Sequence, residues 1–97
     1  MHLEHPNRNA LAVFSSHRCG SCRRVLTYLS QHPPMQHIFV IEAEEAMGLI
    51  EEFEIFHLPT LLLYKHGYFH ANVTIHSPSD IANAIQRALS QPPQDEP

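Results

Sequence analysis

The chain has 97 residues, of which 43% are hydrophobic, and a formal net charge of −4 at pH 7. This length allows one domain with a modest core, and the composition is neither that of a disordered chain nor that of a membrane protein. The negative net charge gives no reason to expect nucleic-acid binding. The longest apolar runs, such as residues 61–64, are far too short to cross a bilayer.

The two ends of the chain are polar and rich in proline. Residues 1–9 predict a flexible leader, and residues 91–97 predict a disordered tail, so the domain is expected over residues 10–90. The leader has neither the basic start nor the continuous apolar core of a signal peptide. We therefore expect a cytoplasmic protein.

The first half of the domain predicts a strand, a helix and a second strand. Residues 10–14 form a short apolar run bounded by polar residues, which is typical of a buried strand. Apolar residues recur at helical spacing over residues 20–31, and two prolines at 33–34 end this helix. Residues 37–41 are nearly all apolar, which predicts a parallel strand covered on both faces.

The second half predicts a helix, a hairpin and a last helix. Residues 44–53 have a helical pattern, and Gly48 within it predicts a short or bent helix. Residues 60–64 and 68–75 read as two strands joined by a tight turn, the second of them at a sheet edge. Ser77 and the proline after it are a strong helix start, and an apolar stripe follows.

The predicted order of elements is therefore β-α-β-α-β-β-α. The first three elements form a βαβ unit, whose two strands are parallel and whose crossover is nearly always right-handed. The hairpin adds antiparallel strands to the same sheet. We expect a three-layer α/β fold in which a mixed four-stranded sheet has helices on both faces.

Cys19 and Cys22 are the only cysteines, and they lie between the first predicted strand and the first predicted helix. Free backbone N–H groups and the positive end of the helix dipole favour a thiolate at this position. Positive charge flanks the pair at Arg18, Arg23 and Arg24, which favours a thiolate further. Two cysteines at this spacing indicate either a redox pair or half of a metal site.

This order of elements, with C-G-S-C at residues 19–22 and L-P-T at residues 58–60, resembles the thioredoxin-like superfamily. The resemblance covers about residues 10–90. It is closest over residues 59–67, which are similar to the run from thioredoxin's cis-proline to its hairpin turn. It implies a thioredoxin-like fold and thiol–disulfide oxidoreductase activity without a cofactor.

The resemblance also implies roles for single residues. Cys19 would attack a substrate disulfide, and Cys22 would resolve the mixed disulfide that results. Pro59 would be a cis-proline beside the two sulfurs, and Leu58 would offer backbone groups to an extended substrate. Ile75 falls near a glycine of the family's substrate groove, so its side chain would narrow that groove.

The sequence departs from the family pattern around the second thiol. A buried acid assists this thiol in thioredoxins, and Val13 stands at its position; Val40 stands at the position of the lysine that pairs with the acid. Without that carboxylate, we expect either that reduction of partners is slow or that water or a histidine takes the proton of Cys22 instead. Arg18 replaces the family's aromatic residue before the first cysteine. The C-P-Y-C motif of glutaredoxins is absent, so glutathione recognition of that type is not supported.

Nine histidines are an unusual number for this length, and we expect most of them at the surface; His66 and His70 lie at the predicted hairpin turn. No second C-x-x-C motif or histidine pair on one helix face completes a zinc set, so no metal site is predicted. His17 and His57 lie in loops that the fold would bring toward Cys19. Each is either a residue that tunes the thiolate or relays its proton, or a solvated loop residue.

The main interpretation is a small enzyme that exchanges its dithiol with disulfides in proteins or small molecules. Its partners would be disulfide-containing substrates and a reductase or thiol donor, and it would act as a monomer without nucleic acid or membrane. The alternative is a non-catalytic thioredoxin-fold adaptor for protein association. The missing acid–lysine pair and Ile75 favour the adaptor, whereas two intact thiols at a helix start favour the enzyme. A zinc-binding domain is the third possibility.

Overall fold

The computed structural model describes residues 9–95, which form one four-stranded sheet and three α-helices. The strands are β1 (Ala10–Ser15), β2 (His37–Glu42), β3 (Thr60–Lys65) and β4 (Tyr68–Val73). They lie in the order β2-β1-β3-β4, with β2 parallel to β1 and the other neighbouring pairs antiparallel. The mixed sheet predicted from the sequence is therefore confirmed.

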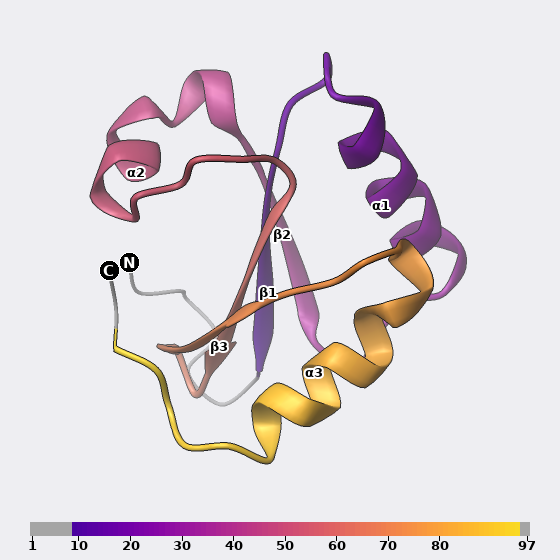
Figure 1. Cartoon of the computed structure of the whole chain (residues 1–97), viewed down its shortest axis with the longest axis vertical. Coiled ribbons are helices and arrows are strands. Elements are labelled where there is room, and N and C mark those ends of the chain that lie inside the picture. The colour runs from indigo at the N-terminus through magenta and orange to yellow at the C-terminus, as the bar shows by residue number, and fades with distance from the viewer. Residues whose placement is uncertain (1–8, 96–97) are drawn as a thin grey trace.

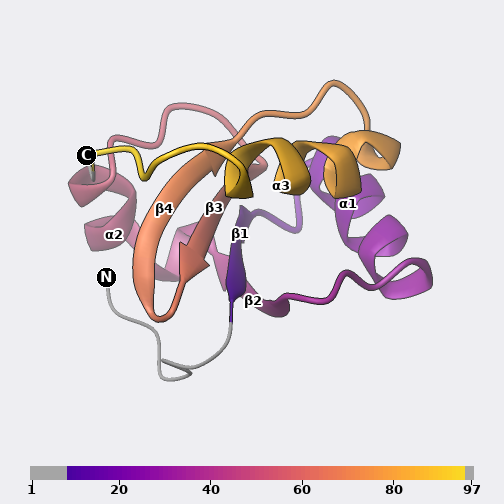
Figure 2. The ribbon, with the colours of Figure 1, turned by 90° about the horizontal axis from the view of Figure 1, so that it is seen from below.

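Helices cover the two faces of this sheet. The α-helices are α1 (Gly20–Gln31), α2 (Met47–Glu52) and α3 (Ile81–Leu89), and the short 3₁₀ helices η1 (Ala43–Glu45) and η2 (Pro78–Asp80) precede α2 and α3. Figure 1 shows α1 and α3 on one side of the strands and α2 on the other, and Figure 2 shows the layers from below. The predicted three-layer fold is confirmed. Within the described residues, no helix has the length and apolar character needed to cross a membrane.

Strand β1 is the centre of the core because it has a strand on each side and helices over both faces. All six of its residues are buried. Leu11 and Val13 point toward α1 and α3, where they pack in one cluster with Val25 and Ile85. Phe14 points to the opposite face and belongs to the cluster beneath α2. Burial from both sides explains why this strand is an uninterrupted apolar run.

Strand β2 lies at one edge of the sheet, and β4 lies at the other. The expectation that residues 37–41 are covered on both faces holds only in part: Ile38 packs against one core cluster and Phe39 and Ile41 against the other, but no residue of β2 is fully buried and Val40 is 55% exposed. The second neighbour of β1 is the hairpin strand β3, which leaves β2 with one partner. The edge position expected for β4 agrees with the structure.

The helix predicted over residues 44–53 is short and interrupted, as its glycine suggested. The interruption itself falls at Ala46, whose backbone (φ −131°) separates η1 from α2, while Gly48 lies inside α2. Phe53 follows α2 directly and is buried beneath it at 4% exposed. The strand predicted over residues 68–75 is also shorter than expected and ends at Val73.

The chain enters its last helix through the start predicted at Ser77. The carboxylate of Asp80 accepts hydrogen bonds from the backbone N–H groups of His76 and Ser77, each at 3.0 Å. These two hydrogen bonds hold the pKa of Asp80 below its ordinary value. Pro78 occupies the first helical position, where its missing N–H costs nothing. The predicted start is therefore confirmed, although its first turn is the 3₁₀ helix η2.

The leader predicted for residues 1–9 lies almost wholly outside the described residues, and the disordered tail predicted for residues 91–97 stays a prediction. In the described part of that tail, the backbone N–H of Gln94 donates to the carbonyl of His70 at 2.7 Å. The Gln94 side-chain oxygen accepts a hydrogen bond from Asn72 N–H at 2.9 Å. These two bonds join this part of the chain to β4.

His70 is an exception to the surface position expected for the histidines. It is 3% exposed, and its Nε2 lies 2.8 Å from the carbonyl oxygen of Ala88 in α3. The register of the hairpin shifts by one residue between Leu63 and Tyr64. This bulge breaks the alternation of β4, so His70 and its neighbour Ala71 are both buried.

Candidate active site

The two cysteines lie where β1 ends and α1 begins. Cys19 is the N-cap of α1: its backbone is extended (φ −101°, ψ 117°), and its Sγ accepts a hydrogen bond from the backbone N–H of Cys22 at 3.3 Å. The first N–H groups of a helix have no partner within the helix, so a sulfur at this position meets hydrogen-bond donors. Cys22 is completely buried, whereas Cys19 is partly exposed.

The segment before β3 approaches the exposed sulfur from another part of the chain. The Cys19 thiol lies 3.8 Å from the carbonyl oxygen of Leu58. The peptide bond between Leu58 and Pro59 is cis. The Thr60 hydroxyl donates to the carbonyl of His57 at 2.6 Å, which closes a tight turn across this segment. Cys19 and Leu58 are thus brought together, although they lie 39 positions apart in the sequence.

The two thiols have different pKa values. The pKa of Cys19 is lowered from its ordinary value of 9.0 by hydrogen bonds from Cys22, first from its side chain and then from its backbone. The backbone of Ser21 and the charge of Arg23 lower the pKa of Cys19 further. Burial disfavours the charged form of Cys22 and raises its pKa to about 11. Cys19 is therefore the thiol that ionises first, and Cys22 keeps its proton.

The arginines next to Cys19 make different contacts. The Arg23 guanidinium donates to the carbonyl of His17 at 3.0 Å, and its charge contributes to the lowered pKa of Cys19. The Nε atom of Arg18 lies 3.7 Å from Oε1 of Glu44, so a carboxylate balances this second charge. The structure therefore gives Arg23 the more direct electrostatic action on the thiolate.

Replacing Arg23 with glutamine is expected to raise the pKa of Cys19 by less than about one unit, because the hydrogen bonds to the sulfur remain. The measurement is the rate of alkylation by iodoacetamide as a function of pH, which reports on Cys19 because Cys22 is buried. The inflection for the wild type is expected below 9.0, and that for Arg23→Gln at higher pH. Arg18→Gln is the matched control and is expected to shift the pKa less. An equal shift in both variants would contradict this interpretation.

The two histidines predicted near the site have different surroundings. The Nδ1 atom of His17 lies 3.7 Å from Oε2 of Glu42, and the His17 side chain is 68% exposed. His57 is exposed and lies beside Leu58 on the wall of a groove. That either histidine tunes the thiolate of Cys19 stays a prediction.

Glu42 is the residue of this region that sequence reasoning missed. Val13 and Val40 face each other across β1 and β2, and Val13 is completely buried, so an apolar pair stands where the resemblance implies an acid and a lysine. The carboxylate nearest in the sheet is that of Glu42, the last residue of β2. The Oε1 atom of Glu42 is buried and has no hydrogen-bond partner among the described residues. The register of the parallel strands, which pairs Glu42 with Ser15, is the signal that could have found it.

His17, Glu42 and Glu44 bring a ring nitrogen and two carboxylates within 4.8 Å of one another. One nitrogen and two carboxylates are a donor set that divalent cations accept. However, Oε1 of Glu44 accepts a hydrogen bond from the Ser16 hydroxyl at 3.1 Å and lies 3.7 Å from the Arg18 guanidinium. Because the charge of Glu44 is already balanced, we interpret this cluster as a network of ion pairs rather than as a metal site.

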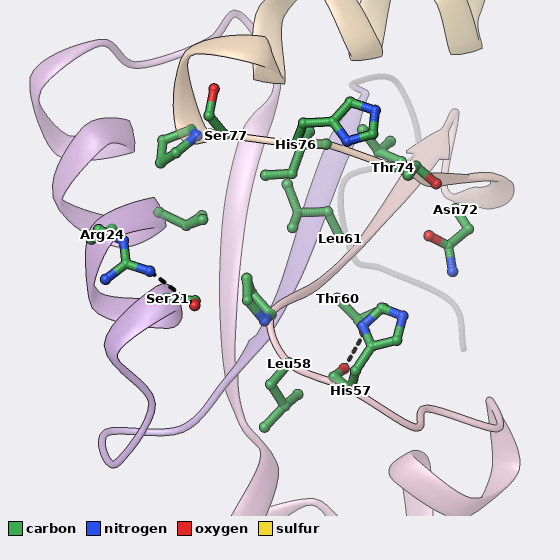
Figure 3. Close-up of a pocket in the computed structure, with 15 residues that line it drawn as sticks. Ser21, Arg24, His57, Leu58, Thr60, Leu61, Asn72, Thr74, His76 and Ser77 are labelled. Atoms are coloured by element: carbon green, nitrogen blue, oxygen red, sulfur yellow. Dashed lines mark hydrogen bonds between the residues drawn. The ribbon is translucent and has the colours of Figure 1, made fainter.

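A groove of about 550 Å³ lies between α1, the segment before β3 and the residues after β4. Figure 3 shows Ser21 and Arg24 of α1 on one side of it, where the Arg24 guanidinium donates to the Ser21 hydroxyl at 3.1 Å. Leu58 lies across from them. The three residues expected to bind substrate, Leu58, Pro59 and Ile75, all line this groove. The structure thus brings the three residues together in one groove, and Leu58 connects this groove to Cys19, whose sulfur lies 3.8 Å from the Leu58 carbonyl oxygen.

No family model matches the sequence, and no curated protein matches it. Solved structures do match. Mitochondrial thioredoxin 3 from Saccharomyces cerevisiae has a TM-score of 0.72 and 21% identity over 86% of this chain and 81% of its own. A thioredoxin variant from Halobacterium salinarum has a TM-score of 0.74 and 20% identity over 92% of this chain and 81% of its own.

A third similar structure is thioredoxin h from poplar, with a TM-score of 0.71 and 24% identity over 88% of this chain and 79% of its own. Thioredoxins from several species therefore share the architecture of this chain, which has a thioredoxin-like fold. At these levels of identity the similarity establishes the fold. What the site does has to be argued from its own residues.

Proposed function

We propose that this chain is a thiol–disulfide oxidoreductase that exchanges the dithiol and disulfide forms of Cys19 and Cys22 with protein or small-molecule disulfides. The observation that carries the proposal is the 3.3 Å hydrogen bond from Cys22 N–H to Cys19 Sγ at the start of α1. It supports a thiolate on an exposed sulfur, with a protected second thiol one helical turn away. Disulfide exchange needs this combination.

The reaction runs in two exchange steps. The Cys19 thiolate attacks one sulfur of the substrate disulfide, the substrate S–S bond breaks, and a mixed disulfide forms while the other substrate sulfur leaves and takes a proton from water. Cys22 then loses its proton, and its sulfur attacks that of Cys19. The mixed disulfide breaks and the second substrate thiol leaves. Two electrons have passed to the substrate, and the reverse sequence oxidises a substrate dithiol.

The proposed substrate site is the groove beside the exposed thiol. Leu58, Pro59 and Ile75 line it, and the carbonyl of Leu58 is 3.8 Å from the Cys19 thiol. An extended peptide in this groove would place its disulfide at Cys19 and its backbone against Leu58. Ile75 lines this groove, and its side chain is proposed to narrow the groove and so to select among partners.

Four residues are proposed to tune the Cys19 thiolate. They are Arg18, Arg23, His17 and His57, which lie close to Cys19 in the sequence or in the expected fold. The contribution of the Arg23 charge to the lowered pKa of Cys19 gives this residue the strongest support. A thiolate stabilised in this way favours the dithiol form, which makes the disulfide more oxidising.

The proposed partners are disulfide-containing proteins together with a reductase or a thiol donor. The cytoplasmic location and the monomeric state stay predictions from the sequence. A mitochondrial thioredoxin is among the structural neighbours, so the fold itself does not select a compartment.

The experiment that tests the proposal is the equilibrium of Cys19 and Cys22 with glutathione, followed by trapping of free thiols, with insulin reduction measured in parallel. We expect a reversible disulfide between the two cysteines and turnover of insulin in the presence of a thiol donor. The same experiment gives the working direction, because it measures the redox potential of the pair against that of glutathione. A chain whose thiols stay unpaired at oxidising ratios of glutathione would contradict the proposal.

The second candidate function is a protein-interaction module. It is favoured by Val13 and Val40, which replace an acid–lysine pair with an apolar one, and by the side chain of Ile75 in the groove. A Cys22→Ser variant separates the two functions. An oxidoreductase is expected to hold its substrates as mixed disulfides that a reductant releases, whereas an adaptor would retain its partners in the presence of the reductant.

A further inference from the structure

Two hollows of the surface meet beside Cys19. One is the groove described above, and the other, of about 290 Å³, lies beside α2 and is called here the α2 hollow. His57 and Leu58 line both of them. The Leu58 carbonyl oxygen lies 3.8 Å from the Cys19 sulfur. A substrate chain that places its disulfide at Cys19 therefore extends into the groove on one side and toward the α2 hollow on the other.

The charged residues that line the two hollows have opposite signs. The α2 hollow is lined by Glu44, which belongs to the cluster with Glu42 and His17. The groove is lined by Arg24, and none of the described residues that line it is an aspartate or a glutamate. Because the whole chain has a net charge of −4, a positively charged groove is an exception to its general character.

Arg24 has hydrogen-bonding capacity to spare for a ligand. Its exposed guanidinium donates to the uncharged Ser21 hydroxyl at 3.1 Å, and it forms no ion pair with any carboxylate of residues 9–95. A guanidinium has five N–H donors in a planar fork, and this fork matches the two oxygens of a carboxylate. The charge of Arg24 is therefore available to an acidic group bound in the groove.

Two histidines lie across the groove from Arg24. Figure 3 shows His57 and His76 on the side opposite α1, and both side chains are exposed. An imidazole donates an N–H whether it is neutral or charged, so each can donate to a carboxylate. The carboxylate of Asp80 does not line the groove, and it accepts the backbone N–H groups of His76 and Ser77 at 3.0 Å.

We propose that the groove selects disulfide substrates that are acidic peptides, in which a carboxylate next to the reacting cysteine pairs with Arg24. The inference rests on the proposed oxidoreductase function and names its substrate class. An arginine–carboxylate pair forms two parallel hydrogen bonds, and the two histidines add donors from the opposite wall. An acidic side chain on the other side of the cysteine would approach Glu44. The preference for acid therefore applies to one side of the substrate cysteine.

The test uses short peptides whose single cysteine carries thionitrobenzoate in a mixed disulfide. The Cys19 thiolate attacks the peptide sulfur, the bond to thionitrobenzoate breaks, and the coloured thiolate leaves. One peptide has two glutamates before the cysteine, a second has them after it, and a third has glutamine at all four positions. We expect one glutamate peptide to react about fivefold faster than the glutamine peptide at low ionic strength, and the other no faster. Added salt is expected to bring the ratio toward one.

The decisive variant is Arg24→Gln, for which the ratio of the rates with the preferred glutamate peptide and the glutamine peptide is expected to fall from about five to about one. This ratio cancels any change in the reactivity of the Cys19 thiolate, because both peptides meet the same sulfur. Arg87→Gln is the matched control: it removes the same charge from an exposed side chain of α3 that does not line the groove. It is expected to keep the ratio within about twofold. An unchanged ratio in Arg24→Gln, or an equal loss in both variants, overturns the proposal.

The peptides also separate failure of this inference from failure of the proposed function. Equal rates for all three peptides overturn the inference and leave the oxidoreductase function standing, whereas no release from any peptide contradicts that function. Equal acceleration by glutamates on both sides overturns the inference as well, because such an effect does not need the groove. The small disulfide of thioglycolate and its amide are compared in the same way. A fivefold preference for that small anion would overturn the peptide as the source of the carboxylate.

Discussion

Replacing Cys19 with serine is expected to abolish disulfide exchange, lowering its rate by more than about a thousandfold. A hydroxyl does not ionise near neutral pH and forms no bond to sulfur that Cys22 can reduce. The fold should not suffer, because serine is itself a preferred N-cap and can accept the Cys22 N–H that now bonds to Sγ. The measurement is insulin reduction with a thiol donor, accompanied by urea unfolding to show that the variant is folded.

Cys22→Ser is the contrasting variant for this prediction. Its exposed thiol remains, so we expect attack on the substrate to proceed and the mixed disulfide at Cys19 to accumulate. Mass spectrometry of the trapped species identifies which cysteine carries the adduct. Residual exchange in Cys19→Ser, or an adduct on Cys22 in the wild type, would contradict the assignment of Cys19 as the nucleophile.

Replacing Phe14 with alanine is expected to lower the free energy of unfolding by about 3–5 kcal/mol, the usual cost of truncating a buried phenylalanine. Phe14 is completely buried in β1, and its ring centroid lies 6.5 Å from that of Phe53 at the end of α2. Domains are typically stable by about 5–15 kcal/mol, so this loss removes much of the stability of the chain. Urea unfolding followed by circular dichroism measures it.

Phe56→Ala is the matched control because it deletes the same atoms from a side chain that is 89% exposed. Its effect on the free energy of unfolding is expected within about 0.5 kcal/mol. If the two variants lost comparable free energies of unfolding, the interpretation that burial of Phe14 stabilises the fold would be wrong. The pair therefore measures burial separately from residue type.

The element order could be predicted because local patterns determine it. Three features depend only on residues that are close together in the sequence: the apolar run of β1, the helical spacing in α1 and the helix start at Ser77. Which strands lie at the edges depends on pairing that is remote in the sequence. The apolar residues of β2 therefore suggested a covered strand, although Val40 is exposed, and the bulge that buries His70 left no local signal.

The candidate site was predictable where its parts are adjacent in the sequence. The spacing of Cys19 and Cys22 and their position at the start of a predicted helix indicate a redox pair. Glu42 lies 20 positions beyond Cys22, and only the parallel register of β1 and β2, which pairs it with Ser15, brings it to the end of β1. The absence of an acid at Val13 was visible in the sequence, whereas the position of the Glu42 carboxylate beside the end of β1 required the sheet.

Cys19 combines two tasks that most proteins give to different residues: it is the sulfur that ionises and the acceptor that caps α1. A disulfide sulfur is neutral and a weaker acceptor than a thiolate, so closing the Cys19–Cys22 bridge deprives the helix of a charged cap. Folding and oxidation then form one thermodynamic cycle. Whatever free energy of folding the loss of this charged cap costs on oxidation also makes the disulfide a stronger oxidant by the same amount, so the stability of one helical turn helps to set a redox potential.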